Sequence, residues 1–333
     1  KICFFYGKNI HNKLKLKKIE LTKPLPNLIN NKKFFSLSDG QYIFKLLDFN
    51  KNFLIGKSLS KFKLQPHKGL NIPEAIYDDN LQLRNYKKFL EKSKSVRFDA
   101  IGLSYVQTRK TIDYIRYLYN DKIIVSKIEN LEGLKNIKEI VEASDVIMID
   151  RGDLAAEVGN HKLFNAVIEI TKETKKQGKP LIMATENLDS MIMRNTPTKS
   201  EVISLGLNSL LESDYIMLSE ETAISHNWHN ILKWLNNFQS NSKNFNHNYI
   251  NRLVSEDNKF HTHKDNQNDI WSSVRFNRND SFVFVSRSGA SIKEFKKRYF
   301  LNKSFVFTDS IKTRNLCRFW KEVKPFYLKS IGG

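Results

Sequence analysis

The chain has 333 residues, with 55 Lys and Arg against 35 Asp and Glu, and a formal net charge of +20. This length allows two or three domains, each with a real core. The charge favours anionic partners such as phosphorylated metabolites, nucleic acid or anionic lipid. A surplus of Lys, Asn and Ile is also typical of AT-rich coding sequences and explains the charge without any partner. No basic motif studded with aromatic residues, as single-stranded nucleic acid requires, stands out.

The cysteine content and the hydropathy narrow the class of protein. The two cysteines, Cys3 and Cys317, lie far apart, so the sequence predicts neither a disulfide framework nor a cysteine metal cluster, and a reducing cytoplasm fits. No apolar run is long enough to span a bilayer. The opening KICFFYGKNI is too short for a secretory apolar region, and since the chain opens on Lys rather than Met, we expect residues to precede it.

Residues 1–67 are predicted to form a small, basic, antiparallel β domain. Apolar residues are interspersed with lysines between Leu14 and Leu21. The pair Asp39-Gly40, between FFSL and YIFKLL, is a strong hairpin signal. A second turn near residues 48–51 precedes FLIGKSLSKFKL, and residues 68–73 then close the domain.

From about residue 80 the pattern changes to alternating strands and helices. Short, branched apolar runs predict buried parallel strands at 98–106, 122–130, 146–149, 180–185 and 215–222. Helical spacing predicts helices at 111–119, 131–141, 163–175, from Thr198 onward and at 229–238, and Pro197, Thr198 and Glu201 form a capping-box pattern. Five such units fit either a doubly wound open sheet or part of a (β/α)₈ barrel, and they are too few to close a barrel.

The last part of the chain predicts a linker and a smaller α/β unit. Residues 240–270 are rich in Asn, His and Ser. SFVFVSRSGAS at 281–291 then predicts a strand, a glycine turn and a basic helix. SFVFTDS at 304–310 predicts another strand, and TRNLCRFWKEV at 313–323 another helix.

Polar residues follow each predicted strand, and two of these strand ends carry carboxylates. Glu129 and Asp153 follow adjacent strands and suit a divalent cation that keeps some of its water; the alternative is two rim carboxylates bonded to neighbouring cations. Lys127 lies two residues before Glu129 and therefore on the same side of its strand, where an ion pair with Glu129 is possible. Gly152 and Asp153 open a helical turn whose backbone N–H groups can hold a carboxylate.

A series of motifs in one order resembles the pyruvate kinase family over most of residues 30–330. The motifs are Lys127-Ile128-Glu129-Asn130, Arg151 to Leu154, Ala184 to Met191, Pro197-Thr198 with Glu201, and Met217 to Ala223. The resemblance implies an α/β fold containing a partial (β/α)₈ TIM barrel, strands 4–8, whose first three strands are absent here. It also implies a β-rich lid domain at 1–67, a barrel portion at 68–245 that holds the active site, and part of a C-terminal α/β domain at 246–333.

The resemblance implies phosphoryl transfer from phosphoenolpyruvate to ADP, giving pyruvate and ATP in glycolysis, in the cytoplasm and in a homo-oligomer. Lys127 and Thr185 are the implied catalytic residues, Gly152, Asp153 and Thr185 the substrate-binding ones, and Glu129 and Asp153 the Mg²⁺ ligands. Potassium is expected too, but its ligands belong to the absent strands. Ser104 is a weaker rim candidate. Ser286, Ser288 and Gly289 resemble the family's effector phosphate loop, although a plain turn is the commoner use of such residues.

Several positions depart from the family pattern and support a second hypothesis. Ala155 stands where the family usually has Gly, Glu186 and Asn187 replace Gln and Met, Glu220 replaces Gly, and Gln107 replaces Arg. Glu186 adds negative charge near the expected metal. The alternative is therefore a catalytically inactive relative that serves as a scaffold or binds RNA in an assembly. A regulatory metabolite-binding module is a third possibility and rests on the region of Ser286 alone.

Overall fold

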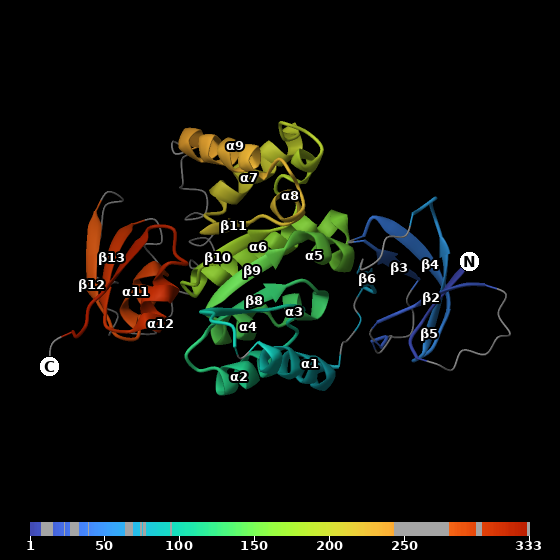
Figure 1. The fold of residues 1–333 in the computed structure, drawn as a ribbon, viewed down its shortest axis with the longest axis horizontal. Helices are drawn as coiled ribbons and strands as arrows, with labels where there is room; N and C mark the ends of the chain where they lie inside the picture. The colour runs from blue at the N-terminus through green and yellow to red at the C-terminus, as the bar shows by residue number, and fades with distance from the viewer. Residues whose placement is uncertain are drawn as a thin grey trace, which may run out of the picture.

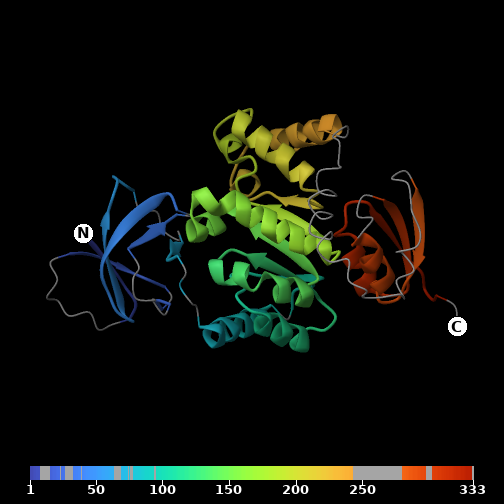
Figure 2. The same cartoon turned by 180° about the vertical axis from the view of Figure 1, so that it is seen from behind.

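The computed structural model describes residues 1–7, 16–22, 24–26, 33–38, 40–63, 69–73, 75, 78–93, 95–242, 280–297 and 302–331. These residues form three sheets, of six, five and three strands. The five-stranded sheet and its helices occupy the middle of the molecule, and the six-stranded and three-stranded sheets lie at its opposite ends (Figures 1 and 2). None of the helices formed by these residues has the length and apolar character that crossing a membrane requires.

The central sheet confirms the five predicted parallel strands. They are β7 (Ala100–Leu103), β8 (Ile123–Ile128), β9 (Val146–Asp150), β10 (Leu181–Ala184) and β11 (Tyr215–Met217), in the order β11-β10-β9-β8-β7. Every neighbouring pair is parallel, so all five carboxyl ends meet at one edge of the sheet. The strand predicted at 215–222 ends early, because α8 (Glu220–Ala223) begins within it.

Helices cover one face of this sheet. They are α1 (Asp79–Lys92), α2 (Arg109–Leu118), α3 (Leu131–Lys135), α4 (Ile137–Ala143), α5 (Arg151–Val158), α6 (Asn160–Lys176), α7 (Lys199–Leu210) and α9 (Trp228–Asn241), with a 3₁₀ turn, η1, at Asp189–Ile192. Ile124 and Ile147 of the strands share a buried cluster with Ile140 and Ile170 of the helices. On the other face, Ile123 and Val125 belong to a second buried cluster. Thr198 and Glu201 form the predicted capping box at the start of α7.

The six-stranded sheet is mainly antiparallel, as predicted. Its strands are β1 (Ile2–Phe5), β2 (Lys17–Glu20), β3 (Phe34–Leu37), β4 (Tyr42–Phe49), β5 (Phe53–Ser58) and β6 (Leu70–Asn71), in the order β2-β1-β5-β4-β3-β6. The predicted hairpin is the antiparallel pair β3 and β4, joined through Gly40 at φ 87°, while Asp39 lies outside the described residues. The prediction was wrong for β1 and β2, which pair in parallel.

This sheet closes around stacked phenylalanines and reaches the central unit. Phe35 and Phe44 stack with ring centroids 5.0 Å apart, and Phe4 packs edge-on against both. The short strand β6 pairs with β3, so the sheet extends past residue 67, up to Asn71. The boundaries predicted for the three domains stay a prediction.

The three-stranded sheet forms the predicted smaller α/β unit. It contains the parallel strands β12 (Ser281–Val285), β13 (Lys303–Thr308) and β14 (Val323–Tyr327), with helices α11 (Ala290–Lys296) and α12 (Ile311–Cys317). The helix predicted at 313–323 was wrong in its second half, because Val323 begins β14. The linker predicted at 240–270 falls mostly on residues 243–279, outside the described part.

Candidate active site

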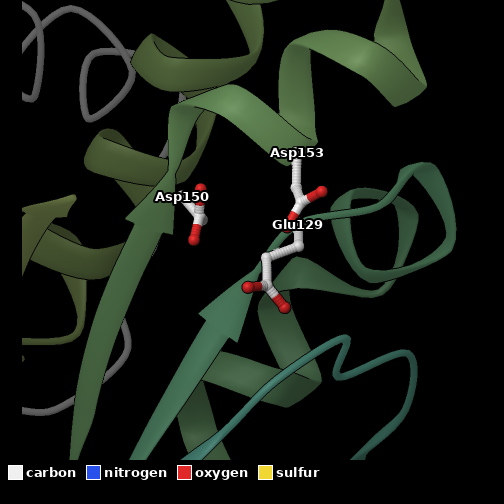
Figure 3. A group of neighbouring side chains, drawn as sticks. All are labelled: Glu129, Asp150 and Asp153. Carbon is white, nitrogen blue, oxygen red and sulfur yellow. The ribbon is translucent and has the colours of Figure 1, made fainter. Parts of the chain in front are cut away.

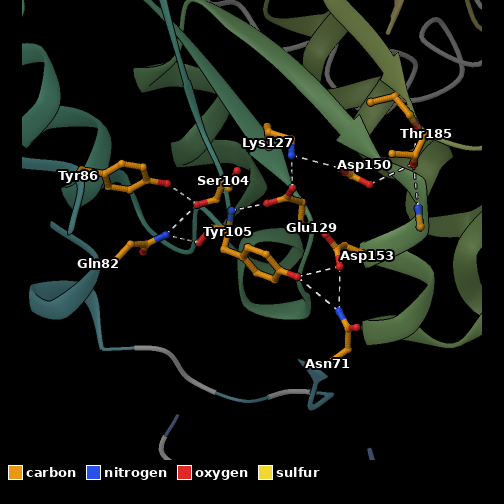
Figure 4. Close-up of polar contacts among 12 residues, drawn as sticks. Asn71, Gln82, Tyr86, Ser104, Tyr105, Lys127, Glu129, Asp150, Asp153 and Thr185 are labelled. Atoms are coloured by element: carbon orange, nitrogen blue, oxygen red, sulfur yellow. Dashed lines mark hydrogen bonds and ion pairs between the residues drawn. The ribbon is translucent and has the colours of Figure 1, made fainter. Parts of the chain in front are cut away.

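The carboxyl ends of β8, β9 and β10 bring together most of the residues singled out in the sequence (Figure 4). Lys127 lies in β8, on the face of the sheet that carries Ile123 and Val125. Glu129 follows this strand directly. Its carboxylate is 1% exposed, and its Oε1 lies 2.5 Å from Lys127 Nζ. The predicted ion pair therefore forms at the strand edge, and the ammonium avoids an uncompensated burial.

Three carboxylates converge at this edge of the sheet (Figure 3). Oxygen atoms of Glu129, Asp150 and Asp153 all lie within 4.8 Å of one another. Asp153 Oδ1 accepts hydrogen bonds of 2.8 Å from the Tyr105 hydroxyl and from Asn71 Nδ2, and Glu129 Oε2 accepts one from the backbone N–H of Tyr105. Mg²⁺ prefers a few carboxylate oxygens together with water and substrate oxygens. This donor set therefore fits a hard divalent cation.

Burial gives two of these carboxylates, Glu129 and Asp153, an unusual affinity for protons. It raises the pKa of Glu129 to about 8, although the neighbouring ammonium of Lys127 acts in the opposite direction. Burial also raises the pKa of Asp153, against the hydrogen bonds from Tyr105 and Asn71. Burial by itself would lower the pKa of Lys127, but Glu129 and Asp150 together raise it above its usual value. The lysine thus stays charged, whereas Glu129 and Asp153 hold protons more tightly than exposed carboxylates do.

Thr185 lies on the other side of Asp150, just past β10. Its hydroxyl donates to Asp150 Oδ1 over 3.0 Å, and its Oγ1 accepts the backbone N–H of Gly152 over 3.1 Å. Thr185 and Glu186 have φ angles of 58° and 49°, in the left-handed region that is rare for a β-branched residue. Such strain costs about 1–3 kcal/mol per residue and gathers at functional sites.

Arg151 holds this strained segment in place. Its guanidinium is buried and donates to the Thr185 carbonyl, to Asn187 Oδ1 over 2.8 Å and to Ser204 Oγ over 2.6 Å. Burial lowers the pKa of Arg151, while the nearby Glu186 acts to raise it. Arg151 therefore supports the turn around Thr185 rather than facing the three carboxylates.

The end of β7 contributes backbone groups rather than the Ser104 hydroxyl. The Ser104 carbonyl accepts from Gln82 Nε2 over 2.7 Å and from the Tyr86 hydroxyl over 2.6 Å. These bonds fix the turn in which Tyr105, at φ 53°, directs its N–H to Glu129 and its hydroxyl to Asp153. Ser104 itself thus has a structural part at this rim.

The structure does not bring the predicted effector loop to this site. The loop joins β12 to α11 and contains Ser286, Ser288 and Gly289. It belongs to the three-stranded unit, at the opposite end of the molecule from the six-stranded sheet (Figure 1). Gly289 N–H donates to Ser286 Oγ over 3.0 Å, and Gly289 has φ 78°. The loop forms a tight glycine turn, and its effector role stays a prediction.

Three residues of the site escaped the sequence analysis. Asp150 ends a strand directly before Arg151, so the rule that identified Glu129 applies to it equally. Tyr105 and Asn71 carry no comparable signal, because a backbone turn and a strand of a different sheet bring them to Asp153.

Comparison with known proteins decides the family. Residues 6–228 match the family described as pyruvate kinase, barrel domain. The chain belongs to the pyruvate kinase family. It is 32% identical to the pyruvate kinase of Encephalitozoon cuniculi over 198 residues, which are 59% of this chain and 46% of that protein. It is 38% identical to the Dictyostelium discoideum pyruvate kinase over 167 residues, or 48% of this chain and 32% of that protein.

The pyruvate kinase fold is supported independently by a solved structure. A pyruvate kinase from Cryptosporidium parvum superposes with a TM-score of 0.70, covering 100% of this chain and 72% of that one at 22% identity. This confirms the predicted fold class, a partial barrel accompanied by a β-rich unit and a further α/β unit. The segments matched in the Encephalitozoon cuniculi and Dictyostelium discoideum pyruvate kinases cover less than half of each of those two proteins.

Proposed function

We propose that the protein containing this chain is a pyruvate kinase that transfers a phosphoryl group from phosphoenolpyruvate to ADP, giving pyruvate and ATP in glycolysis. The observation that supports this proposal is the cluster of Lys127 with Glu129 and Asp153 at one edge of the parallel sheet (Figure 4). Phosphoryl transfer depends on positioning and charge neutralisation more than on covalent chemistry. The cluster offers one fixed cation and a cation-binding group of carboxylates for that purpose.

The two substrates carry several negative charges that repel one another. Glu129 and Asp153 would hold Mg²⁺, which would offset the negative charge of the phosphate groups. The ammonium of Lys127 lies within reach of the same position and offsets the charge of the group in transfer. Its two carboxylate partners hold it in place before the substrates arrive.

The start of α5 supplies the second part of the site. The backbone N–H groups of Gly152 and Asp153 can receive the substrate carboxylate, since the first amides of a helix have no partner within it. Gly152 N–H donates to Thr185 Oγ1, so the carboxylate exchanges places with this oxygen or uses the amide of Asp153. When the phosphoryl group leaves the enol oxygen, the enolate takes a proton at carbon, and the family resemblance implies that Thr185 would lie beside that carbon.

The proposal also includes the cellular location, the oligomeric state and a potassium ion. Both cysteines are free, which supports a cytoplasmic location, and the family makes a homo-oligomer the expected state. Potassium is part of the proposal through the family alone, since its expected ligands belong to strands outside this chain.

A coupled assay of pyruvate formation on the full-length protein tests the function. We expect Lys127→Ala to keep metal binding and to lose turnover by roughly 10²–10³-fold, as is typical when one preorganised electrostatic group is removed. Asp153→Ala should lose metal binding as well. Lys135→Ala is the control, because Lys135 is an exposed lysine that pairs with Glu132 over 3.2 Å.

An inactive scaffold is the second candidate, and one observation favours it. Asp150 adds a third carboxylate to the site, and Glu186 adds another negative charge near Arg151; both oppose an anionic substrate. If the folded, Mg²⁺-saturated protein and its variants share one background rate, catalysis is absent. Binding to RNA or to an assembly would then be the property to measure.

A further inference from the structure

Asp150 stands between the two side chains that the proposed reaction needs most (Figure 4). It is the last residue of β9 and is 6% exposed. Its Oδ2 lies 3.1 Å from Lys127 Nζ, and its Oδ1 accepts the Thr185 hydroxyl over 3.0 Å. Each oxygen of this carboxylate thus has its own donor. By contrast, the bonds from Tyr105 and Asn71 to Asp153 both reach Oδ1, which leaves Oδ2 to a cation.

Each partner of Asp150 has one other acceptor close by. The Lys127 ammonium is shared between Glu129 and Asp150, so without Asp150 only Glu129 would attract it. The Thr185 hydroxyl also lies 2.8 Å from the carbonyl of Ala184. Loss of Asp150 would leave the hydroxyl with this carbonyl, which belongs to the preceding residue.

We propose that Asp150 is a positioning residue that holds the Lys127 ammonium and the Thr185 hydroxyl in one fixed arrangement. The inference rests on the proposed function, because it assigns to Asp150 the task of orienting two groups of that reaction. Misplacing a reacting or charge-stabilising group by about 1 Å can cost about 10²-fold in rate. A single carboxylate that contacts both groups therefore affects turnover without touching the substrate.

The same carboxylate has an opposite effect on binding. It adds one negative charge close to the position of an anionic substrate, so its removal should favour binding while it harms catalysis. For Asp150→Ala we expect kcat to fall by about 10- to 100-fold and KM for phosphoenolpyruvate to stay equal or to fall. A merely structural defect would instead raise KM. Asparagine has one acceptor oxygen for two donors, so Asp150→Asn should give an intermediate kcat.

The kinetic test uses the full-length protein with saturating Mg²⁺. The matched control is Asp309→Asn, since Asp309 also follows a parallel strand and pairs with one basic side chain, Arg287, over 2.9 Å. If Asp150 acts partly through Thr185, the fold-losses of Asp150→Ala and Thr185→Val should not multiply in the double variant. Fully multiplicative losses, or a rise in kcat in Asp150→Ala, would overturn the proposal. A rise would identify Asp150 as an inhibitory carboxylate.

Two further measurements do not depend on turnover. In Asp150→Ala the affinity for Mn²⁺, read by its electron paramagnetic resonance, should change by less than about threefold; a tenfold loss would make Asp150 a metal ligand and overturn the positioning role. Scalar couplings of the Thr185 methyl group, assigned by its disappearance in Thr185→Val, should show one side-chain rotamer in the unmodified protein and averaging in Asp150→Ala.

These readouts separate the two hypotheses. If no variant makes pyruvate but Thr185 loses its rotamer in Asp150→Ala, the proposed function fails and the positioning by Asp150 stands. If the unmodified protein is active and Thr185 keeps one rotamer in Asp150→Ala, the function stands and the positioning fails.

Discussion

Asp214 forms a buried ion pair within the central unit and accepts a backbone hydrogen bond from the three-stranded unit. Its Oδ2 lies 2.7 Å from Lys175 Nζ, and these side chains are 7% and 4% exposed. The same Oδ2 accepts the backbone N–H of Leu181 over 2.9 Å, while Oδ1 accepts that of Lys321 over 3.0 Å. Removing the carboxylate would leave one buried ammonium and two backbone donors without this acceptor.

The size of the expected loss in stability follows from the buried groups that the substitution leaves in place. Breaking a buried pair by removing one partner typically costs about 3–5 kcal/mol, because the remaining charge loses its counter-ion. We therefore expect Asp214→Ala to lower the free energy of unfolding by about 3–5 kcal/mol. Asp214→Asn should lose less, since its amide oxygen can still accept one backbone N–H.

The measurement is urea unfolding followed by far-ultraviolet circular dichroism. Glu132→Ala serves as the control, because it breaks the exposed pair with Lys135, which should contribute less than about 1 kcal/mol. If Asp214→Ala unfolds within about 1 kcal/mol of the unmodified protein, the carboxylate does not stabilise this junction and the reasoning is refuted.

Three other outcomes are expected. Burial raises the pKa of Glu129 to about 8 and also that of Asp153, so below that pH protons compete with a divalent cation; Mn²⁺ affinity should rise between about pH 6 and pH 8, and a flat profile would contradict these shifts. Gly133→Ala would put a Cβ 2.4 Å from the Val106 carbonyl and should lower the free energy of unfolding by about 1–3 kcal/mol in urea, whereas an unchanged midpoint would mean that the backbone yields freely. Thr198→Ala removes the cap of α7 and should cost about 0.5–2 kcal/mol in the same experiment, unless another group replaces the hydroxyl.

The central fold could be predicted because its signals are local. Runs such as Ile123 to Val125 predict buried strands from the residues themselves, and Thr198 with Glu201 predicts the start of α7. The break between α3 and α4 was missed, because it depends on Asn136, whose Nδ2 donates to the distant carbonyl of Gln107 over 2.8 Å. The parallel pairing of β1 with β2 was missed for a similar reason, since hydrogen bonds between segments well separated in sequence decide it.

The residues of the candidate site also fall into two groups, those that local sequence predicts and those that distant contacts bring in. Lys127, Glu129 and Asp153 follow strands that can be read from the sequence, so their convergence could be expected from parallel topology. Asp150 also ends a strand, so the same rule predicts its place at this edge of the sheet. It directly precedes the motif Arg151 to Leu154 and was not singled out. The bonds from Tyr105 and Asn71 to Asp153 arise from a left-handed turn and from another sheet, and no local pattern predicts either.

The bond from Asn71 to Asp153 has a thermodynamic consequence. Asn71 ends the six-stranded sheet, and Asp153 belongs to the carboxylate cluster of the central unit. Any cation that changes the charge of this carboxylate changes the strength of the bond that ties the two units together. Linkage is reciprocal, so the free energy that cation binding adds to or removes from this connection equals the free energy by which the connection alters cation binding. An independent measurement of how firmly the β-rich unit is attached to the central unit would therefore also report on cation binding at this carboxylate cluster.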